Sequence, residues 1–269
     1  MFDNGIGFDI ELVSILIPAL LAGLLVLSTH VVLGQQVLKR GIIFIDLAIA
    51  QVAALGTIIG HLNHDLAELP FSNVWMPAIF AIAGAGIIAW LSRRMSDELE
   101  AFIGCFYVLA AVAAMLILAN DPHGAELLKQ LLSGQILWVN LSQLVFPAIA
   151  YTLILLLLIL KPCLLEGRAF YLIFAIVITL SVELVGVYLV FSSLILPALA
   201  INRYYGRFGL ALAYLVGIFG YCGGLMLSAS WDLPSGAVIV ACLALSAMLM
   251  RVTLKVCYKK ETEQSVLSK

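Results

Sequence analysis

Four polar side chains lie inside long apolar stretches and are the residues best suited to chemistry. They are His30, Asp46, Gln51 and Glu183. An ionisable group at the centre of a bilayer costs about 2.5–3.5 kcal/mol on insertion scales, so such groups usually face a protein interior or a wet path. Carboxylate and amide oxygens and imidazole nitrogens suit hard or borderline divalent cations. These residues therefore predict the ligands of a transported cation.

Simpler interpretations exist for some of these residues. His30 lies near the expected cytoplasmic boundary of its helix, where a hydrogen-bonded interfacial role is favoured. Glu183 could pair with a donor at a helix end. Asp46 and Gln51 are separated by about 140° around a helix and about 7.5 Å along it, so they do not share one narrow face. For Asp46, a role in a path is favoured over a structural one.

The composition excludes a water-soluble fold. Of the 269 residues, 64% are hydrophobic and 11% are charged, with a mean hydropathy of +1.13, whereas soluble domains have about 25% charged residues. The apolar runs are long and continuous, which predicts an all-α polytopic membrane protein rather than a barrel of short alternating strands. P-loop, GxSxG and HExxH motifs are absent from the sequence, so we do not expect an enzyme.

Seven apolar segments are each close to the ~20 residues that a helix needs to cross a bilayer. They cover residues 12–33, 41–60, 74–91, 102–119, 141–160, 208–229 and 236–252. Residues 169–201 are too many for one span and few for two. This stretch predicts a helix, a break near Gly186 or Pro197, and a re-entrant or half-length helix. We therefore expect seven to nine membrane helices, with the irregular segment near 186–200.

The domain organisation and orientation follow from where the charges lie. Residues 1–258 are expected to form a single transmembrane domain, and residues 259–269 a disordered cytoplasmic tail. Basic residues gather in alternate loops, beginning with Lys39 and Arg40, which places the N-terminus outside and the C-terminus inside. No basic residue precedes Lys39, so a cleavable signal peptide is not expected.

Glycine pairs and outer loops carry weaker signals. Gly56 with Gly60, and Gly220 with Gly224, have the GxxxG spacing that permits close helix contact, either within the chain or at a dimer seam. Acidic and histidine side chains in the expected outer loops would attract cations by electrostatic focusing, although solvated loops are the default interpretation. These side chains are His61, His64, Asp65, Glu68, Asp121, His123 and Glu126.

Three stretches carry a family resemblance. Residues 34–60 have a basic turn, VLKR, before a helix that bears an acid and closes with glycine. Residues 182–200 read VELVGVYLVFSSLILPALA, and residues 231–240 read WDLPSGAVIV. In this order and spacing, the chain resembles the membrane permease subunit of ATP-binding-cassette importers for zinc, manganese and iron, as a divergent member.

The resemblance implies a mechanism and partners. It implies a homodimer in the bacterial inner (plasma) membrane, with the translocation path at the dimer interface. ATP would be hydrolysed by a separate cytoplasmic ATPase subunit, and an extracytoplasmic metal-binding receptor would deliver the zinc, manganese or iron. No permanently bound cofactor is expected. The alternatives are a gradient-driven, ion-coupled carrier and a metal-chelate permease of the siderophore or cobalamin type.

This sequence departs from the family pattern in two places. The family usually has an Asp and a His four residues apart in the second helix, but here Ala50 follows Asp46 at that distance. Gln51 replaces the His by alignment, and His30 could replace it by chemistry. The family's ATPase-coupling loop is also shortened. Its remnant is predicted to be Leu164, Leu165, Glu166, Gly167 and Arg168.

Overall fold

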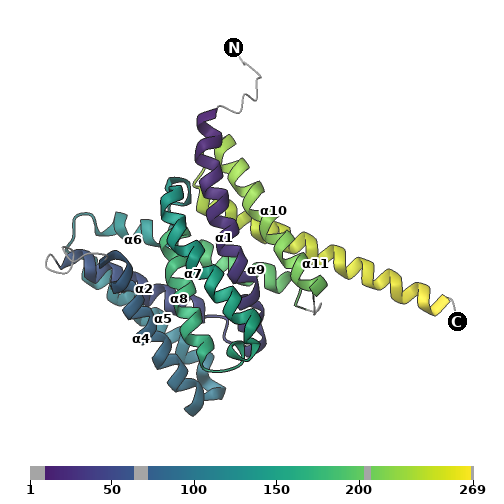
Figure 1. The fold of residues 1–269 in the computed structure, drawn as a ribbon, viewed down its shortest axis with the longest axis horizontal. Coiled ribbons are helices and arrows are strands. Elements are labelled where there is room, and N and C mark those ends of the chain that lie inside the picture. The colour runs from purple at the N-terminus through teal and green to yellow at the C-terminus, as the bar shows by residue number, and fades with distance from the viewer. Residues whose placement is uncertain (1–9, 64–71, 203–206, 268–269) are drawn as a thin grey trace.

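The computed structural model describes residues 10–63, 72–202 and 207–267, with side chains described over residues 14–63, 74–202 and 208–255. In these ranges the chain forms ten α-helices joined by loops and short 3₁₀ turns, without a strand (Figure 1). The all-α prediction is confirmed. The helices are α1 (Ile10–Arg40), α2 (Ile45–Leu62), α4 (Ser72–Arg94), α5 (Leu99–Leu118), α6 (Gly124–Ser133), α7 (Leu141–Leu160), α8 (Ala169–Val185), α9 (Val187–Ala200), α10 (Arg207–Trp231) and α11 (Ser235–Leu267).

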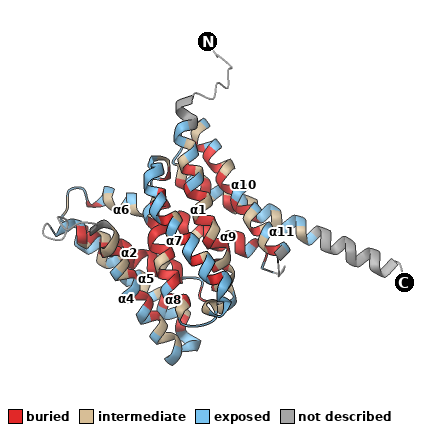
Figure 2. Ribbon diagram, in the orientation of Figure 1, coloured by how far each residue is buried: buried red, intermediate tan, exposed pale blue. Residues whose placement is uncertain are grey.

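Seven of these helices are long and apolar enough to cross a membrane, and they match the seven predicted spans. The helix α2 is the most enclosed of the seven. It buries 67% of its span residues, whereas the others bury between 17% and 44%. By contrast, α5 and α7 present large exposed apolar side chains such as Leu116 and Ile159 (Figure 2). The helix that bears Asp46 therefore runs through the interior of the bundle.

The predicted break in residues 169–201 falls at Gly186. Its φ of 81° ends α8, and such a backbone conformation favours glycine because a side chain would be strained there. Pro197 instead lies within α9. With a rise of 1.5 Å per residue, the 17 residues of α8 extend about 25 Å and the 14 of α9 about 21 Å. Each is shorter than the ~30 Å hydrocarbon core.

Both GxxxG pairs pack inside the chain. Gly56 and Gly60 face Met76 of α4, while Gly220 and Gly224 lie against α11. The missing side chains let the helix backbones approach closely, which is the usual consequence of this spacing. These glycines are therefore used in packing within one subunit.

Three elements differ from the sequence prediction. The first helix continues to Arg40, seven residues beyond the predicted end of its span at 33. A short helix, α6, occupies an expected loop. The last helix, α11, continues to Leu267, through most of the tail predicted to be disordered. Lys, Glu and Gln in that tail have good helix propensity, and they extend a helix that the preceding apolar span has already nucleated.

Candidate functional site

Asp46 lies in the first turn of α2 and is completely buried. Neither of its carboxylate oxygens has a hydrogen-bond partner among the described residues. Most buried polar groups are hydrogen-bonded, so an unpartnered buried carboxylate calls for an explanation such as a bound ion or a catalytic role. The positive end of the α2 dipole favours an acid at this position but does not replace hydrogen bonds.

Gln51 is also buried, with 2% of its surface exposed. The sequence separation places it on a different face of α2 from Asp46, yet both side chains are enclosed because α2 is covered on several sides by α4, α5, α8 and α9. The side-chain oxygen of Gln51 has no hydrogen-bond partner in the described part of the chain. Asp46 and Gln51 therefore both present unpaired side-chain oxygens to the bundle interior.

His30 is not the interfacial residue favoured by the sequence. It is fully buried, because α1 extends well past the predicted boundary and places His30 ten residues before its end. Its Nδ1 lies 3.4 Å from Thr29 Oγ1, and its Nε2 is unpartnered within the described residues. A buried imidazole with one free nitrogen can serve as a ligand or as a proton acceptor.

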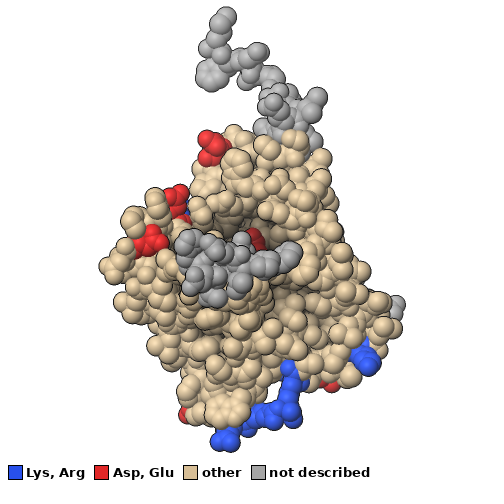
Figure 3. Space-filling model, turned by 60° about the vertical axis from the view of Figure 1, so that its left-hand side comes forward, with Lys and Arg blue, Asp and Glu red and all other residues tan. Residues whose placement is uncertain are grey.

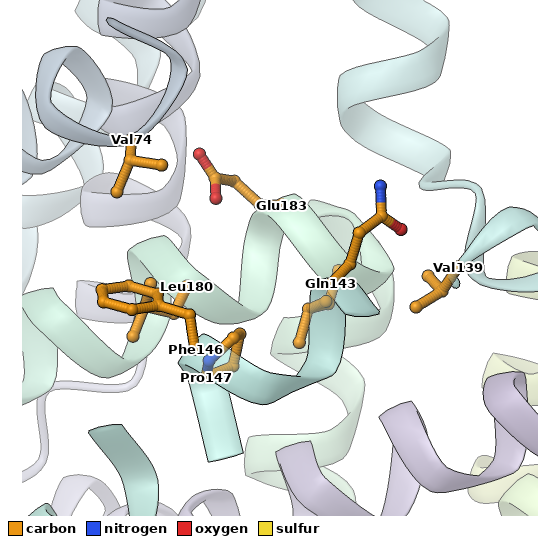
Figure 4. A pocket seen from close by; sticks show the side chains of 8 residues that line it. Val74, Val139, Gln143, Phe146, Pro147, Leu180 and Glu183 are labelled. Atoms are coloured by element: carbon orange, nitrogen blue, oxygen red, sulfur yellow. The ribbon is translucent and has the colours of Figure 1, made fainter. Parts of the chain in front are cut away.

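Glu183 lines a cavity of about 520 Å³ between α4, α7 and α8. Figure 4 shows its carboxylate within a mainly apolar lining that includes Phe146 and Leu180. The side-chain oxygen of the nearby Gln143 is already occupied. It accepts a hydrogen bond from the Asn140 backbone amide at 3.0 Å, as part of the N-terminal cap of α7. Glu183 is therefore the one charged group among the residues that line this cavity.

The predicted ligands lie at different depths. Arg40, the last residue of α1, stacks on Phe170 in the first turn of α8 at 4.4 Å, so these two helix ends are adjacent. Asp46 follows shortly after Arg40 and belongs to the same end of the bundle. At 1.5 Å per residue, His30 lies about 15 Å along α1 from this end, and Glu183 lies about 21 Å along α8.

These residues do not form one ligand cluster within the chain. In the part that the structure describes, no three His, Cys, Asp or Glu side chains come together in a metal-binding group. The predicted ligand set is instead staggered along the helices. Such an arrangement suits an ion that passes from one ligand to the next, since conduction requires binding that is weak enough for release.

The predicted coupling residues form a compact turn. Leu164 and Leu165 are the last two residues of the 3₁₀ turn Pro162–Leu165, and both pack against the core. Glu166, Gly167 and Arg168 are exposed. Two side chains of α1 hold this turn in place. Gln36 and Arg40 both donate to the Leu165 carbonyl, at 2.9 and 2.7 Å. Sequence reasoning used Arg40 only as an orientation signal and missed this contact.

The outer-loop candidates are placed only in part. His61 is exposed at the end of α2, and Glu126 is exposed on α6. Asp121 Oδ1 accepts a hydrogen bond from the backbone amide of His123 at 2.8 Å, which is a local turn contact. His64, Asp65 and Glu68 lie outside the described residues.

Charge is distributed unevenly over the surface. In Figure 3, most of the visible Lys and Arg side chains gather at one end of the molecule, and most of the visible Asp and Glu side chains lie toward the other. The same face contains a hollow with an acidic group inside it. A basic end and an acidic end are what the positive-inside pattern of the sequence predicts.

Solved structures share this fold. The chain matches PsaBC from Streptococcus pneumoniae, solved in complex with a Fab, with a TM-score of 0.71 and 20% identity, over 90% of this chain and 95% of that one. It also matches an inward-facing ABC transporter assigned to the metal-chelate type, with a TM-score of 0.61 and 16% identity, over 91% and 85% of the two chains. At these identities the likeness is one of fold.

Sequence comparisons identify the family. A relative from Synechocystis sp. (strain ATCC 27184 / PCC 6803 / Kazusa), the uncharacterised membrane protein slr2045, is 28% identical over 244 residues, or 82% of this chain and 84% of that protein. The model of the ABC 3 transport family matches residues 13–165 and 161–254, which together span most of the chain. The chain therefore belongs to the ABC 3 transport family, and the family predicted from the sequence is confirmed.

Proposed function

We propose that this chain is the transmembrane permease subunit of an ATP-driven importer of divalent metal ions such as zinc, manganese or iron. Membership of the ABC 3 transport family supports the transport class, and the fold shared with PsaBC supports the permease role. Permeases of ABC transporters work with an ATPase subunit and a substrate-binding partner. Here these would be a cytoplasmic ATPase and an extracytoplasmic metal-binding receptor.

The observation that carries the proposal is the buried, unpartnered carboxylate of Asp46. A buried charge without a partner costs several kcal/mol even after the protein relaxes. A passing cation would offset this cost while it is bound. Because the described protein groups leave both oxygens free, Asp46 is suited to a transient ligand role.

The other polar residues would assist at different depths. Glu183 would meet the ion in the cavity between α4, α7 and α8, before the ion reaches Asp46. His30 and Gln51 are the two candidates for the family's second ligand, since Ala50 offers no donor atom. We favour His30, because its Nε2 is free and imidazole is a better zinc ligand than an amide.

The complete transporter would be a homodimer in the bacterial inner membrane. The path would run at the interface between two copies, with the N-terminus outside and the C-terminus in the cytoplasm. The positive-inside distribution of Lys and Arg supports this orientation. The exposed residues 166–168 would face the ATPase on the cytoplasmic side.

The proposal is tested in proteoliposomes that contain the permease, its ATPase and its receptor. The measurement is ATP-dependent uptake of zinc, manganese and iron by the wild type, by Asp46→Asn and by the control Asp97→Asn, which changes an exposed acid. We expect Asp46→Asn to lose uptake and the control to retain it. Uptake by Asp46→Asn at the wild-type rate would show that Asp46 is not a path ligand.

The same vesicles distinguish the rival functions. A gradient-driven carrier would continue to import metal after ATP is removed and would stop when the proton gradient is dissipated. A chelate permease would import a metal–siderophore or cobalamin complex and not the free ion. Either result would contradict the proposed function.

A further inference from the structure

We propose that Gln36 and Arg40 fasten residues 164–168 to the end of α1, so that movement of an ATPase docked on this turn is passed directly to α2. This inference rests on the proposed function, because it takes residues 164–168 as the ATPase contact. Gln36 and Arg40 act here as positioning residues. They touch neither the ion nor the nucleotide.

The contact between α1 and the turn is made by several groups at once. Gln36 Nε2 donates to the Leu165 carbonyl oxygen at 2.9 Å, and Arg40 Nη2 donates to the same oxygen at 2.7 Å. Arg40 Nη2 also donates to the Gly167 oxygen at 3.1 Å. The acceptors are backbone carbonyls, so the contact fixes the backbone of the turn and does not depend on the side chains of residues 164–168.

Aromatic stacking orients the arginine. Its guanidinium lies 4.4 Å from the ring centroid of Phe170 and 5.4 Å from that of Tyr171, and the two rings meet edge to face at 76°. A planar guanidinium can stack on an aromatic face while its N–H groups bind carbonyls, which the ammonium of lysine cannot reproduce. The two basic residues at the end of α1 therefore differ in role: Arg40 makes these contacts, whereas Lys39 is exposed.

The opposite end of the linkage is the start of α2. After Arg40 the chain turns at Gly41, with φ of 68°. Gly41 N donates to Leu38 O at 3.3 Å, and Ile42 N donates to Val37 O at 3.4 Å. This pair of bonds is the Schellman motif that closes a helix C-terminus. It leaves a short, hydrogen-bonded connection between Arg40 and Asp46, so a shift of the turn at residues 164–168 would displace the start of α2.

Transport coupling tests the proposal. We compare Arg40→Ala, Gln36→Ala and Arg40→Lys with Lys39→Ala, which removes the neighbouring charge from an exposed position. Each permease is reconstituted with its ATPase and receptor, and the metal imported per ATP hydrolysed is measured. We expect the Arg40→Ala permease to stay bound to its ATPase, which should still hydrolyse ATP. The metal imported per ATP should fall about tenfold, within the range of coupling between distant sites. Arg40→Lys should be intermediate and Lys39→Ala unchanged.

Two outcomes would overturn the proposal. One is a wild-type ratio of metal to ATP in Arg40→Ala. The other is loss of the ATPase from purified Arg40→Ala while Lys39→Ala retains it, because the arginine would then serve docking and not linkage.

A second measurement does not depend on the cargo. Spin labels are placed at the exposed positions Ile43 and Glu166 in a background without native cysteines, and their separation is measured with and without trapped ATP. We expect one narrow distance in both states for the otherwise wild-type permease, and a distance that changes or broadens in Arg40→Ala. An unchanged distance in Arg40→Ala would refute the linkage. Failure of the proposed function would appear separately, as a wild-type complex that imports no metal.

Discussion

Glu100, near the start of α5, accepts a hydrogen bond from the backbone amide of Phe44, with 3.1 Å between Oε1 and N. Phe44 is the N-cap of α2, and its aromatic side chain cannot accept a capping hydrogen bond. A residue distant in sequence therefore supplies the acceptor that the N-terminus of α2 requires. The position of α2, and of Asp46 in its first turn, depends on α5.

Substitution of Glu100 should loosen the start of α2. Loss of a capping acceptor typically costs about 0.5–2 kcal/mol, so we expect Glu100→Ala to unfold at a lower temperature in detergent. Glu98→Ala is the matched control, because Glu98 is exposed at the end of the preceding turn. Equal melting temperatures for the two variants would contradict the capping role.

Removal of the Asp46 carboxylate should stabilise the protein while it abolishes uptake. Replacing even a buried ion pair with apolar side chains of similar volume is often neutral or stabilising by about 1–4 kcal/mol. Asp46 has no partner among the described residues that its loss would strand. We expect Asp46→Leu to unfold at a higher temperature than the wild type. A lower unfolding temperature would indicate that Asp46 has a structural partner.

The break at Gly186 should not tolerate a side chain. Its φ of 81° is strained for other residues, and a Cβ there would overlap the backbone of Gly134. We expect Gly186→Ala to cost about 1–3 kcal/mol, as for other residues held in sparsely populated backbone regions. Gly86→Ala in α4 is the control, since nothing lies within 4 Å of the added Cβ and helix propensity should make it neutral or stabilising.

Glu183 and Asp46 should have different kinetic signatures. Neutralising Glu183 removes the charge that attracts the ion into the cavity, so Glu183→Gln should raise the metal concentration for half-maximal uptake. We expect about a fivefold rise, equivalent to ~1 kcal/mol of attraction, with little change in the maximal rate. Uptake at varied metal concentration measures both quantities. A loss of maximal rate with an unchanged half-saturation concentration would contradict this role.

The spans and the break could be predicted because they depend on local properties of the sequence. Membrane helices follow from the length and hydropathy of a segment. A break near Gly186 or Pro197 could be predicted because residues 169–201 fit neither one span nor two, and the structure places it at the glycine, which permits the required φ. The polar residues Asp46 and Gln51 were likewise evident, because few strongly polar side chains interrupt that apolar run.

The features that could not be predicted depend on tertiary contacts. Burial of His30 follows from packing of an extended α1 against its neighbours, and hydropathy alone ended that span too early. The role of Arg40 requires the carbonyl of Leu165, which lies 125 residues away. Likewise, the staggering of Glu183 and Asp46 along the bundle is visible only once the ends of α1 and α8 are known to meet.

Gly134 and Gly186 touch through backbone atoms, and Gly236 at the start of α11 lies against the neighbouring Ser133. A contact between two backbones contains no rotatable side chain that could absorb displacement. A displacement of the end of α6 would therefore be transmitted to the break between α8 and α9 with little loss. A protein that displaced α6 would thereby also shift Glu183 along the bundle, because Glu183 lies three residues before Gly186.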